Sequence, residues 1–315
     1  MTAFIGVDVG GTKIAAWLCD AAFVSLAERI YPTPASAKPL SNIPITAETE
    51  GEGRNALISA IIHVCKELQD EASHHNLVVS AIGIGSAGQI DTRSGIVLDA
   101  NENLVGWRGT PLARLVEEAL HIPVFVENDV RAMALAECTL GAGKDYEHVL
   151  CITVGTGIGG AIVLNRQVWH GEHFSAGEIG YLYATPDHTI EEIASGAALE
   201  RHYQAQTHNP EMKSLQTIAQ QATNGDEIAR DVIERGARLL GNVLAPVIAL
   251  LDPQAVVVGG GMTEMDTLWW QPFVQTIQQF RLASVQQTPL LKATFGTRAG
   301  MIGAAVLVMQ KGGQR

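Results

Sequence analysis

The chain has few charged residues, and it contains no basic run and no long apolar run. Only 17% of its 315 residues are charged while 47% are hydrophobic, a balance that predicts folded domains with sizeable cores rather than disorder. The net charge is −12, and no lysine- or arginine-rich stretch occurs. Nucleic acid and acidic membrane surfaces are therefore poor partners by bulk electrostatics.

Cysteine pairs at metal-binding or redox spacing are also absent. The four cysteines share an apolar context and none is spaced as CxxC: Cys19, Cys65, Cys138 and Cys151. We expect them to be buried thiols in a reducing compartment. His170, His173 and His188 lie in a loop-like region without nearby cysteines, which argues against a zinc site there.

Membrane and export signals are missing as well. The apolar stretch 239–251 is interrupted by Asn242 and Pro246, so it is shorter than the roughly 20 apolar residues that span a bilayer. The first residues are apolar, but no basic segment precedes them and Asp8 interrupts them. We expect a soluble, cytoplasmic protein.

Several common catalytic motifs are absent. No Walker A lysine motif exists, and no Ser-His-Asp arrangement is evident from spacing. The glycines of 155–160 lead into an apolar run typical of a strand, whereas a dinucleotide-binding fold needs a helix at that point.

One stretch, residues 124–160, contains two parts of a phosphotransferase. Asp129 stands at the start of a predicted helix over 130–140, and Gly155-Thr156-Gly157-Ile158-Gly159-Gly160 separates two apolar strands. Asp129 fits an ordinary helix N-cap, and it also fits a general base that the helix dipole keeps ionised. The glycine turn fits a phosphate-binding loop.

A similar turn occurs near the N-terminus, where Gly10-Gly11-Thr12-Lys13 separates two apolar runs. It fits either a plain hairpin turn or a loop that approaches a ligand closely. Asp8 is a carboxylate inside an apolar strand, and Mg²⁺, bound directly or through water, is one candidate partner. The two glycine hairpins predict a duplicated α/β architecture that holds one phosphate chain from both sides.

The remaining segments alternate between predicted helices and strands. Residues 32–54 contain several prolines and glycines and predict an irregular surface insertion, followed by a helix over 54–73. Amides in 101–103 beside Trp107 fit a sugar site or an ordinary loop. A buried strand ends in Gly259-Gly260-Gly261, a third point of close backbone approach.

Five motifs together resemble the ROK family, which takes its name from repressors, open reading frames and kinases. They occur in the family's order and span nearly the whole chain: GVDVGGTK at 6–13, ENDVRAMALAE at 127–137, TVGTGIGGAIV at 153–163, AGEIG at 176–180 and VVVGGG at 256–261. The resemblance implies a two-domain α/β fold of the hexokinase–actin (ribonuclease H-like) type with an interdomain cleft. We expect domains at 1–126 and 127–298, with a helix over 299–315 packing back on the first.

The resemblance also implies roles for individual residues. Asp129 matches the catalytic base, and Asn128, Glu178 and Glu191 match sugar-binding positions. Asn103, from the amide-rich stretch beside Trp107, and Tyr181 are also predicted to contact the sugar. The nucleotide-binding positions are Gly10, Gly11, Thr12, Lys13, Gly155, Thr156, Gly157, Gly259, Gly260 and Gly261. ATP and Mg²⁺ are the implied cofactors, with Asp8 near the metal, and the family implies a homodimer or homotetramer.

Two departures from the family pattern occur together. Tyr181 stands where relatives commonly carry a histidine, and the interval 182–190 has no cysteine where relatives carry a zinc segment. We therefore predict no structural zinc, and the sugar contact at that position must come from Tyr181 or be absent.

The predicted function is ATP-dependent phosphorylation of a hexose or amino sugar, of glucose or N-acetylmannosamine type, on a primary hydroxyl. Alternatives are a kinase for fructose or a β-glucoside, and a non-catalytic sugar-sensing ROK protein without a DNA-binding domain. We expect the sugar and ATP to be the partners, with no nucleic acid and no membrane.

Overall fold

The computed structural model describes residues 2–37, 46–100, 104–208 and 214–312. The chain divides into two compact units, and each is described by itself. The first contains residues 1–139, 170–175 and 297–315, and the second contains 140–169 and 176–296. The sequence analysis placed the boundary after residue 126, whereas this division keeps the helix that begins at Asp129 in the first unit.

The first unit is a five-stranded sheet with helices on both faces. Its strands are β1 (Thr2–Val9), β2 (Lys13–Asp20), β3 (Ser25–Pro32), β4 (Val78–Ser86) and β7 (Val124–Asn128), in the order β3-β2-β1-β4-β7. A separate hairpin contains β5 (Gln89–Asp91) and β6 (Ile96–Asp99). The helices are α1 (Ala47–His74), α2 (Leu112–Leu120), α3 (Asp129–Thr139) and α10 (Ala299–Gly312), with 3-10 turns at Ala35–Ala37 and Gly296–Arg298.

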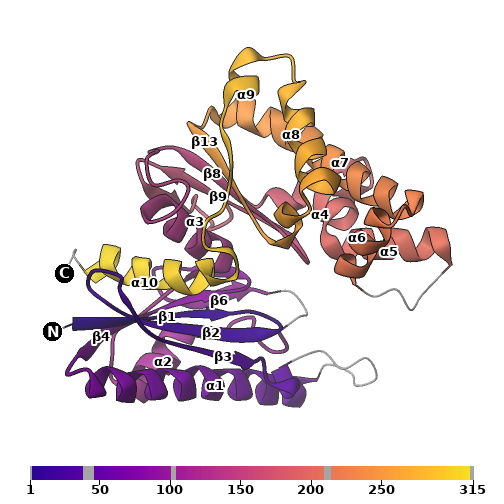
Figure 1. Cartoon of the computed structure of the whole chain (residues 1–315). Helices are drawn as coiled ribbons and strands as arrows, with labels where there is room; N and C mark the ends of the chain where they lie inside the picture. The colour runs from indigo at the N-terminus through magenta and orange to yellow at the C-terminus, as the bar shows by residue number, and fades with distance from the viewer. Residues whose placement is uncertain (1, 38–45, 101–103, 209–213, 313–315) are drawn as a thin grey trace. The chain divides into compact units, whose positions relative to one another are not determined.

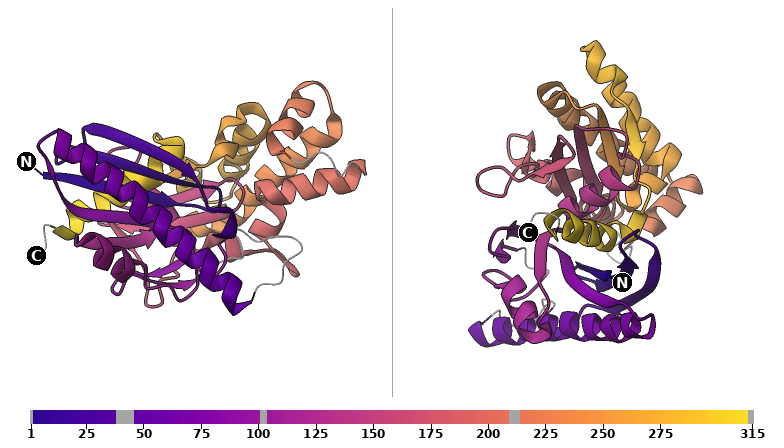
Figure 2. Two further views of the ribbon diagram at one scale, coloured as in Figure 1. Left: turned by 90° about the horizontal axis from the view of Figure 1, so that it is seen from below. Right: turned by 90° about the vertical axis from the view of Figure 1, so that its left-hand side faces the viewer.

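Helix packing in this unit follows the apolar pattern of the sequence. α1 contributes Leu57, Ile61 and Leu68 to a core that also contains Ile5 and Ile82 from the sheet. α10 lies across the opposite face, where it packs on β1, β4 and α3 (Figures 1 and 2). The last helix of the chain thus joins the first unit, the one to which the sequence analysis assigned it.

The second unit repeats this sheet. Its strands are β8 (Val149–Val154), β9 (Ile158–Leu164), β10 (Gln167–Trp169), β13 (Ala255–Gly259) and β14 (Leu290–Lys292), in the order β10-β9-β8-β13-β14, beside a small hairpin of β11 (Tyr183–Thr185) and β12 (His188–Thr189). The helices are α4 (Ile190–Ala194), α5 (Gly196–Thr207), α6 (Leu215–Thr223), α7 (Glu227–Leu251), α8 (Gln271–Gln278) and α9 (Ala283–Gln287), with short turns at Ile179–Tyr181 and Gly261–Glu264 and a π-helical turn at Asp266–Trp270.

The two sheets share one plan, as the glycine hairpins predicted. In each, three antiparallel strands are followed by two strands parallel to the first: β1 pairs with β4 in parallel, and β8 pairs with β13 in parallel. Each glycine turn joins the first two strands of its sheet, β1 to β2 and β8 to β9. The predicted duplicated α/β architecture is therefore confirmed.

The predicted insertion at 32–54 was wrong at its C-terminal end, because α1 begins at Ala47 rather than at residue 54. Thr46 and Thr49 form a capping box at the start of the helix. The Thr46 side chain accepts the backbone N–H of Thr49, and the Thr49 side chain accepts the backbone N–H of Thr46. The glycines that suggested a loop lie inside the helix. A side chain at Gly53 would come within 2.8 Å of the Val105 carbonyl oxygen, so glycine here allows close packing. Residues 38–45 lie outside the described ranges.

The Trp107 side chain is not exposed for contact with a sugar. It is fully buried in the core, and its indole N–H donates to the Ser86 hydroxyl at 2.9 Å. Asn103 and its neighbours at 101–102 lie outside the described residues, so the sugar contact predicted for Asn103 stays a prediction.

Candidate active site

Three parallel strands of the first unit end at the same edge of their sheet. β1 ends next to Asp8, β4 ends at Ser86, and β7 runs into Asn128 and then Asp129. Ligands of open α/β sheets bind outside the carboxyl ends of such strands. The topology therefore brings Asp8 and Asp129, which are 121 positions apart in the sequence, to the same edge.

Asn128 organises the start of α3. Its carbonyl oxygen Oδ1 accepts the backbone N–H groups of Val130 and Arg131 at 3.0 and 3.1 Å, so Asn128 is the N-cap. Its amide Nδ2 donates to the Gly88 carbonyl and to Asp129 Oδ1, both at 2.9 Å. Asp129 is therefore the first helical residue rather than the cap, which corrects the N-cap reading of its position.

Two groups hold one oxygen of the Asp129 carboxylate. Oδ1 accepts from the Asn128 amide and from the Val130 N–H, each at 2.9 Å. The pKa of Asp129 is raised by burial, against the lowering effects of these two donors and of the Arg131 charge. The hydrogen bonds at the helix start favour the ionised form, as the sequence predicts, but burial has the larger effect on the pKa.

Asp8 is the second carboxylate at this edge. Its pKa is raised to about 7, first by burial and then by the nearby charge of Asp129, while Lys13 lowers it. α10 begins beside it: a side chain at Gly300 would lie 2.5 Å from the Asp8 carboxyl carbon. Only glycine lets the first turn of α10 approach the carboxylate so closely.

The first glycine turn is fixed by a residue that the sequence analysis did not single out. The Thr33 hydroxyl donates to the Gly10 carbonyl at 2.6 Å, and the Thr33 N–H donates to the Thr12 carbonyl at 3.0 Å. Thr33 follows β3 directly and is buried. These bonds engage the carbonyls of the turn, while Thr12 stays exposed. Neither motif nor spacing marked Thr33, because its partners lie more than 20 residues away.

The second glycine turn is held by Glu191. The carboxylate oxygen Oε2 accepts the backbone N–H of Ile158 at 2.7 Å, and the Gly155 carbonyl accepts the N–H of Gly196 at 2.7 Å. Glu191 is exposed, although its Oε2 is engaged by the turn. One role of Glu191 is thus to fix a loop, and its predicted sugar contact stays a prediction.

A pocket of about 860 Å³ opens beside this turn within the second unit. It is lined by Gly155, Thr156, Gly196, Ala197, Glu200, Ser214, Leu215, Gln216, Ala219, Gln220, Thr223, Gly261, Met262, Glu264, Met265, Asp266, Thr267 and Leu268. No lysine or arginine is among these residues. The structure brings together Gly155, Thr156 and Gly261 of the predicted nucleotide-binding set. The other lining residues come mainly from α5, α6 and the turn after β13, and no sequence motif marked them.

Gly259 and Gly260 support this pocket rather than line it. Gly259 is buried at the end of β13, and Gly260 takes a left-handed backbone conformation (φ 92°) beside the Val154 carbonyl. Glu178 is half-buried before the turn at Ile179–Tyr181, and the Tyr181 side chain is 74% exposed. Tyr181 is thus open to solvent in this structure, and its predicted sugar contact stays a prediction.

Two kinds of feature are absent from the described ranges: a cluster of metal ligands and a membrane-spanning helix. Within them, no group of three or more histidine, cysteine, aspartate or glutamate side chains is arranged to hold a metal ion. Of the helices in those ranges, none has both the length and the apolar character needed to cross a bilayer.

The repeated sheet, the two glycine turns and the carboxylate pair together define a sugar-kinase-like member of the hexokinase–actin group of folds. Residues 4–311 match the ROK family, and the chain belongs to that family.

Similar proteins share the full length of the chain. It is 30% identical to a glucokinase of Streptomyces coelicolor over 97% of both chains, and 32% identical to an N-acetylmannosamine kinase of Escherichia coli K12 over 96% of this chain and 97% of that one. A crystal structure of a ROK family glucokinase from Streptomyces griseus with glucose and AMPPNP superposes with a TM-score of 0.78, at 32% identity over 98% of this chain and 99% of the other. The expected fold is confirmed.

Proposed function

We propose that the protein is an ATP-dependent sugar kinase that phosphorylates a primary hydroxyl of a hexose or amino sugar of the glucose or N-acetylmannosamine type. The observation that carries this proposal is the Asn128–Asp129 arrangement at the edge of a sheet shared with Asp8. The matched relatives support it, since glucokinases and an N-acetylmannosamine kinase align over nearly the whole chain.

Asp129 is the proposed base. Because the Asn128 amide and the Val130 N–H both bind Oδ1, the other carboxylate oxygen, Oδ2, is the one that accepts the proton of the sugar hydroxyl. The sugar oxygen forms a bond to the γ-phosphorus of ATP as the bond from that phosphorus to the β–γ bridging oxygen breaks, and ADP leaves. The raised pKa of Asp129 suits this role, because a base with a raised pKa binds a proton more strongly than an ordinary carboxylate.

The residues around Asp8 fit a magnesium site. Asp8 offers hard oxygen ligands, and two carboxylates with raised pKa values at one edge are the environment that a divalent cation relieves. When bound, Mg²⁺ would neutralise phosphate charge. Lys13 and the backbone N–H groups of the first glycine turn would hold phosphate oxygens, and Asn128, Glu178 and Glu191 would orient the sugar.

The pocket of the second unit supports a nucleoside triphosphate as the donor. Its volume of about 860 Å³ and its lining by Leu215, Ala219 and Met262 suit an adenosine.

The test is sugar-dependent ADP release in a coupled assay with ATP and Mg²⁺, using D-glucose, N-acetyl-D-mannosamine, D-fructose and a β-glucoside. We expect release with glucose or N-acetylmannosamine well above the sugar-free rate. ADP release with none of these sugars would contradict the proposal and favour a non-catalytic sugar-sensing protein.

A further inference from the structure

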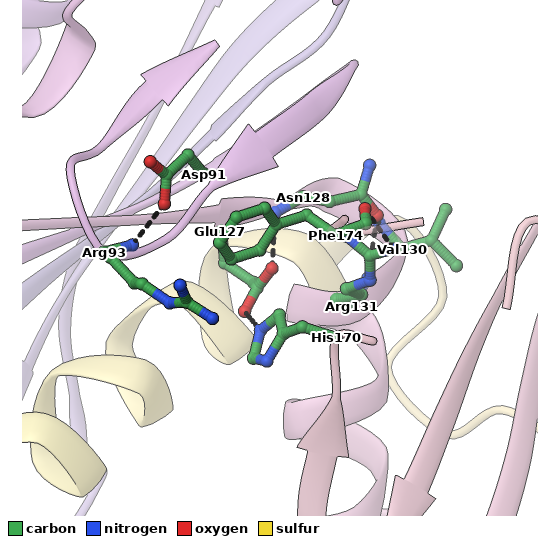
Figure 3. Close-up of polar contacts among 8 residues, drawn as sticks. All are labelled: Asp91, Arg93, Glu127, Asn128, Val130, Arg131, His170 and Phe174. Carbon is green, nitrogen blue, oxygen red and sulfur yellow. Dashed lines mark hydrogen bonds and ion pairs between the residues drawn. The ribbon is translucent and has the colours of Figure 1, made fainter. Parts of the chain in front are cut away.

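A six-residue segment, 170–175, belongs to the first unit although its neighbours on both sides belong to the second. The chain leaves β10 at Trp169, contributes this segment, and returns at Ala176. Figure 3 shows His170 and Phe174 of the segment beside Glu127, Asn128 and Arg131. The 170–175 segment thus lies against the residues on either side of the proposed base, Asp129.

The first contact is a hydrogen bond between His170 and Glu127. His170 Nε2 lies 2.6 Å from Glu127 Oε2, and the Glu127 side chain is only 1% exposed while that of His170 is 25% exposed. A carboxylate can only accept hydrogen bonds, and an imidazole N–H at Nε2 is the donor that suits it. A buried carboxylate that lost this partner would carry a large desolvation cost, which makes the pair a strong restraint.

Glu127 also binds the backbone of Asn128, the residue before the proposed base. Its other oxygen, Oε1, accepts the backbone N–H of Asn128 at 2.9 Å. Asn128 in turn donates to Asp129 Oδ1 and caps α3. A continuous series of hydrogen bonds therefore runs from the His170 ring through Glu127 and Asn128 to the carboxylate of Asp129.

The second contact lies on the other side of the base. The fully buried Arg131 donates from Nη2 to the Phe174 carbonyl at 2.9 Å, and the Arg93 guanidinium lies 5.2 Å from the centre of the Phe174 ring. Phe174 has a left-handed backbone conformation (φ 56°), which a non-glycine residue keeps only where its surroundings impose it. The segment is therefore fixed at both of its ends.

We propose that His170 is a positioning residue for the phosphoryl transfer: through Glu127 and Asn128 it fixes the orientation of the Asp129 carboxylate. This inference rests on the proposed function. Glu178, a proposed sugar contact, follows Ser175 by three residues. The length of this short connection limits how far Glu178 can lie from Ser175.

The test compares His170→Ala with His173→Ala. His173 lies in the same segment, and its side chain is exposed, so it is the matched control. We expect His170→Ala to lower kcat with glucose or N-acetylmannosamine by about tenfold, because a misplaced base loses rate rather than nucleotide affinity. The KM for ATP should stay within twofold, and His173→Ala should match the wild type.

His170→Arg separates positioning from general stability. A guanidinium also donates hydrogen bonds to a carboxylate, so it should restore kcat to within about threefold of the wild type. An unchanged kcat in His170→Ala would overturn the proposal, and so would a defect in His170→Ala that a folded His170→Arg does not repair. If His170→Ala fails to fold, His170→Leu, which also lacks a donor for Glu127, is judged by the same thresholds.

Hydrogen exchange supplies a readout that does not need activity. We expect the backbone amides of 127–131 to exchange at least about tenfold faster in His170→Ala than in His173→Ala, because the restraint on Asn128 is lost. Equal exchange in the two variants would overturn the inference. A wild type that releases no ADP with any sugar would instead overturn the proposed function, so the two failures are distinguishable.

Discussion

The two glycine turns stand at equivalent places in two similar sheets, yet their surroundings differ. The first, Gly10–Lys13, is fixed by Thr33 and lies in the unit that carries the carboxylates Asp8 and Asp129. The second, Gly155–Gly160, is fixed by Glu191 and opens onto an 860 Å³ pocket whose described lining residues include no lysine or arginine. The same hairpin thus stands beside two carboxylates in one unit and beside an open pocket in the other, and we propose reaction chemistry for the first and nucleotide binding for the second.

The largest effect should come from the base in the first unit. Asp129→Asn should lower kcat by about a hundredfold or more, since the amide cannot accept the hydroxyl proton. The affinity for an ATP analogue, whose adenosine is proposed to lie in the pocket of the second unit, should stay within twofold by calorimetric titration. Weakened nucleotide binding in this variant would break the proposed division of roles between the units.

The next largest effects should come from Asp8. This residue is proposed to hold Mg²⁺, and the burial of its ionised carboxylate lowers the free energy of unfolding. Its pKa is raised to about 7 in the folded protein from the ordinary 3.8, so burial disfavours its ionised form. The contribution of Asp8 to the free energy of unfolding is therefore most favourable below pH 3.8, and it is lost as the pH rises towards 7. Asp8→Asn removes this cost, and at pH 8 we expect a higher Tm, by ~2–4 °C per kcal/mol gained.

The same variant should lose activity. Without a carboxylate to hold Mg²⁺, kcat should fall by about ten- to a hundredfold. Its Tm advantage should disappear by about pH 4, where Asp8 of the wild type is protonated as well. Differential scanning calorimetry across that pH range measures the effect, and a Tm advantage independent of pH would rule out Asp8 ionisation as its cause.

A smaller effect should come from the second unit, where a substitution should change the KM for ATP rather than kcat. Ala219→Trp fills part of the pocket and should raise the KM for ATP by about tenfold while kcat and the sugar KM change little. Thr217→Trp is the matched control, because Thr217 lies exposed on the same helix and does not line the pocket. Equal effects of the two substitutions in steady-state kinetics would argue against nucleotide binding there.

The sequence predicted the repeated sheets because hairpins with glycine turns are local signals. It also placed Asp129 at a helix start from the residue order alone. Thr33 and the Glu127–His170 pair could not be found this way, since their partners lie 23 and 43 positions away. The misplaced start of α1 has a different cause: Gly51 and Gly53 predict a loop locally, whereas the Thr46 cap and packing at Gly53 favour a helix.

In the proposed reaction the Asp129 carboxylate accepts the proton of a sugar hydroxyl, and the sugar oxygen takes the γ-phosphoryl group from ATP. Phosphorus NMR of ATP and Mg²⁺ with D-glucose or N-acetyl-D-mannosamine follows the product directly. The wild type should produce ADP and a sugar phosphomonoester in equal amounts, and Asp129→Asn should produce almost none in the same time. Inorganic phosphate in place of the ester, or equal ester from both proteins, would contradict the account.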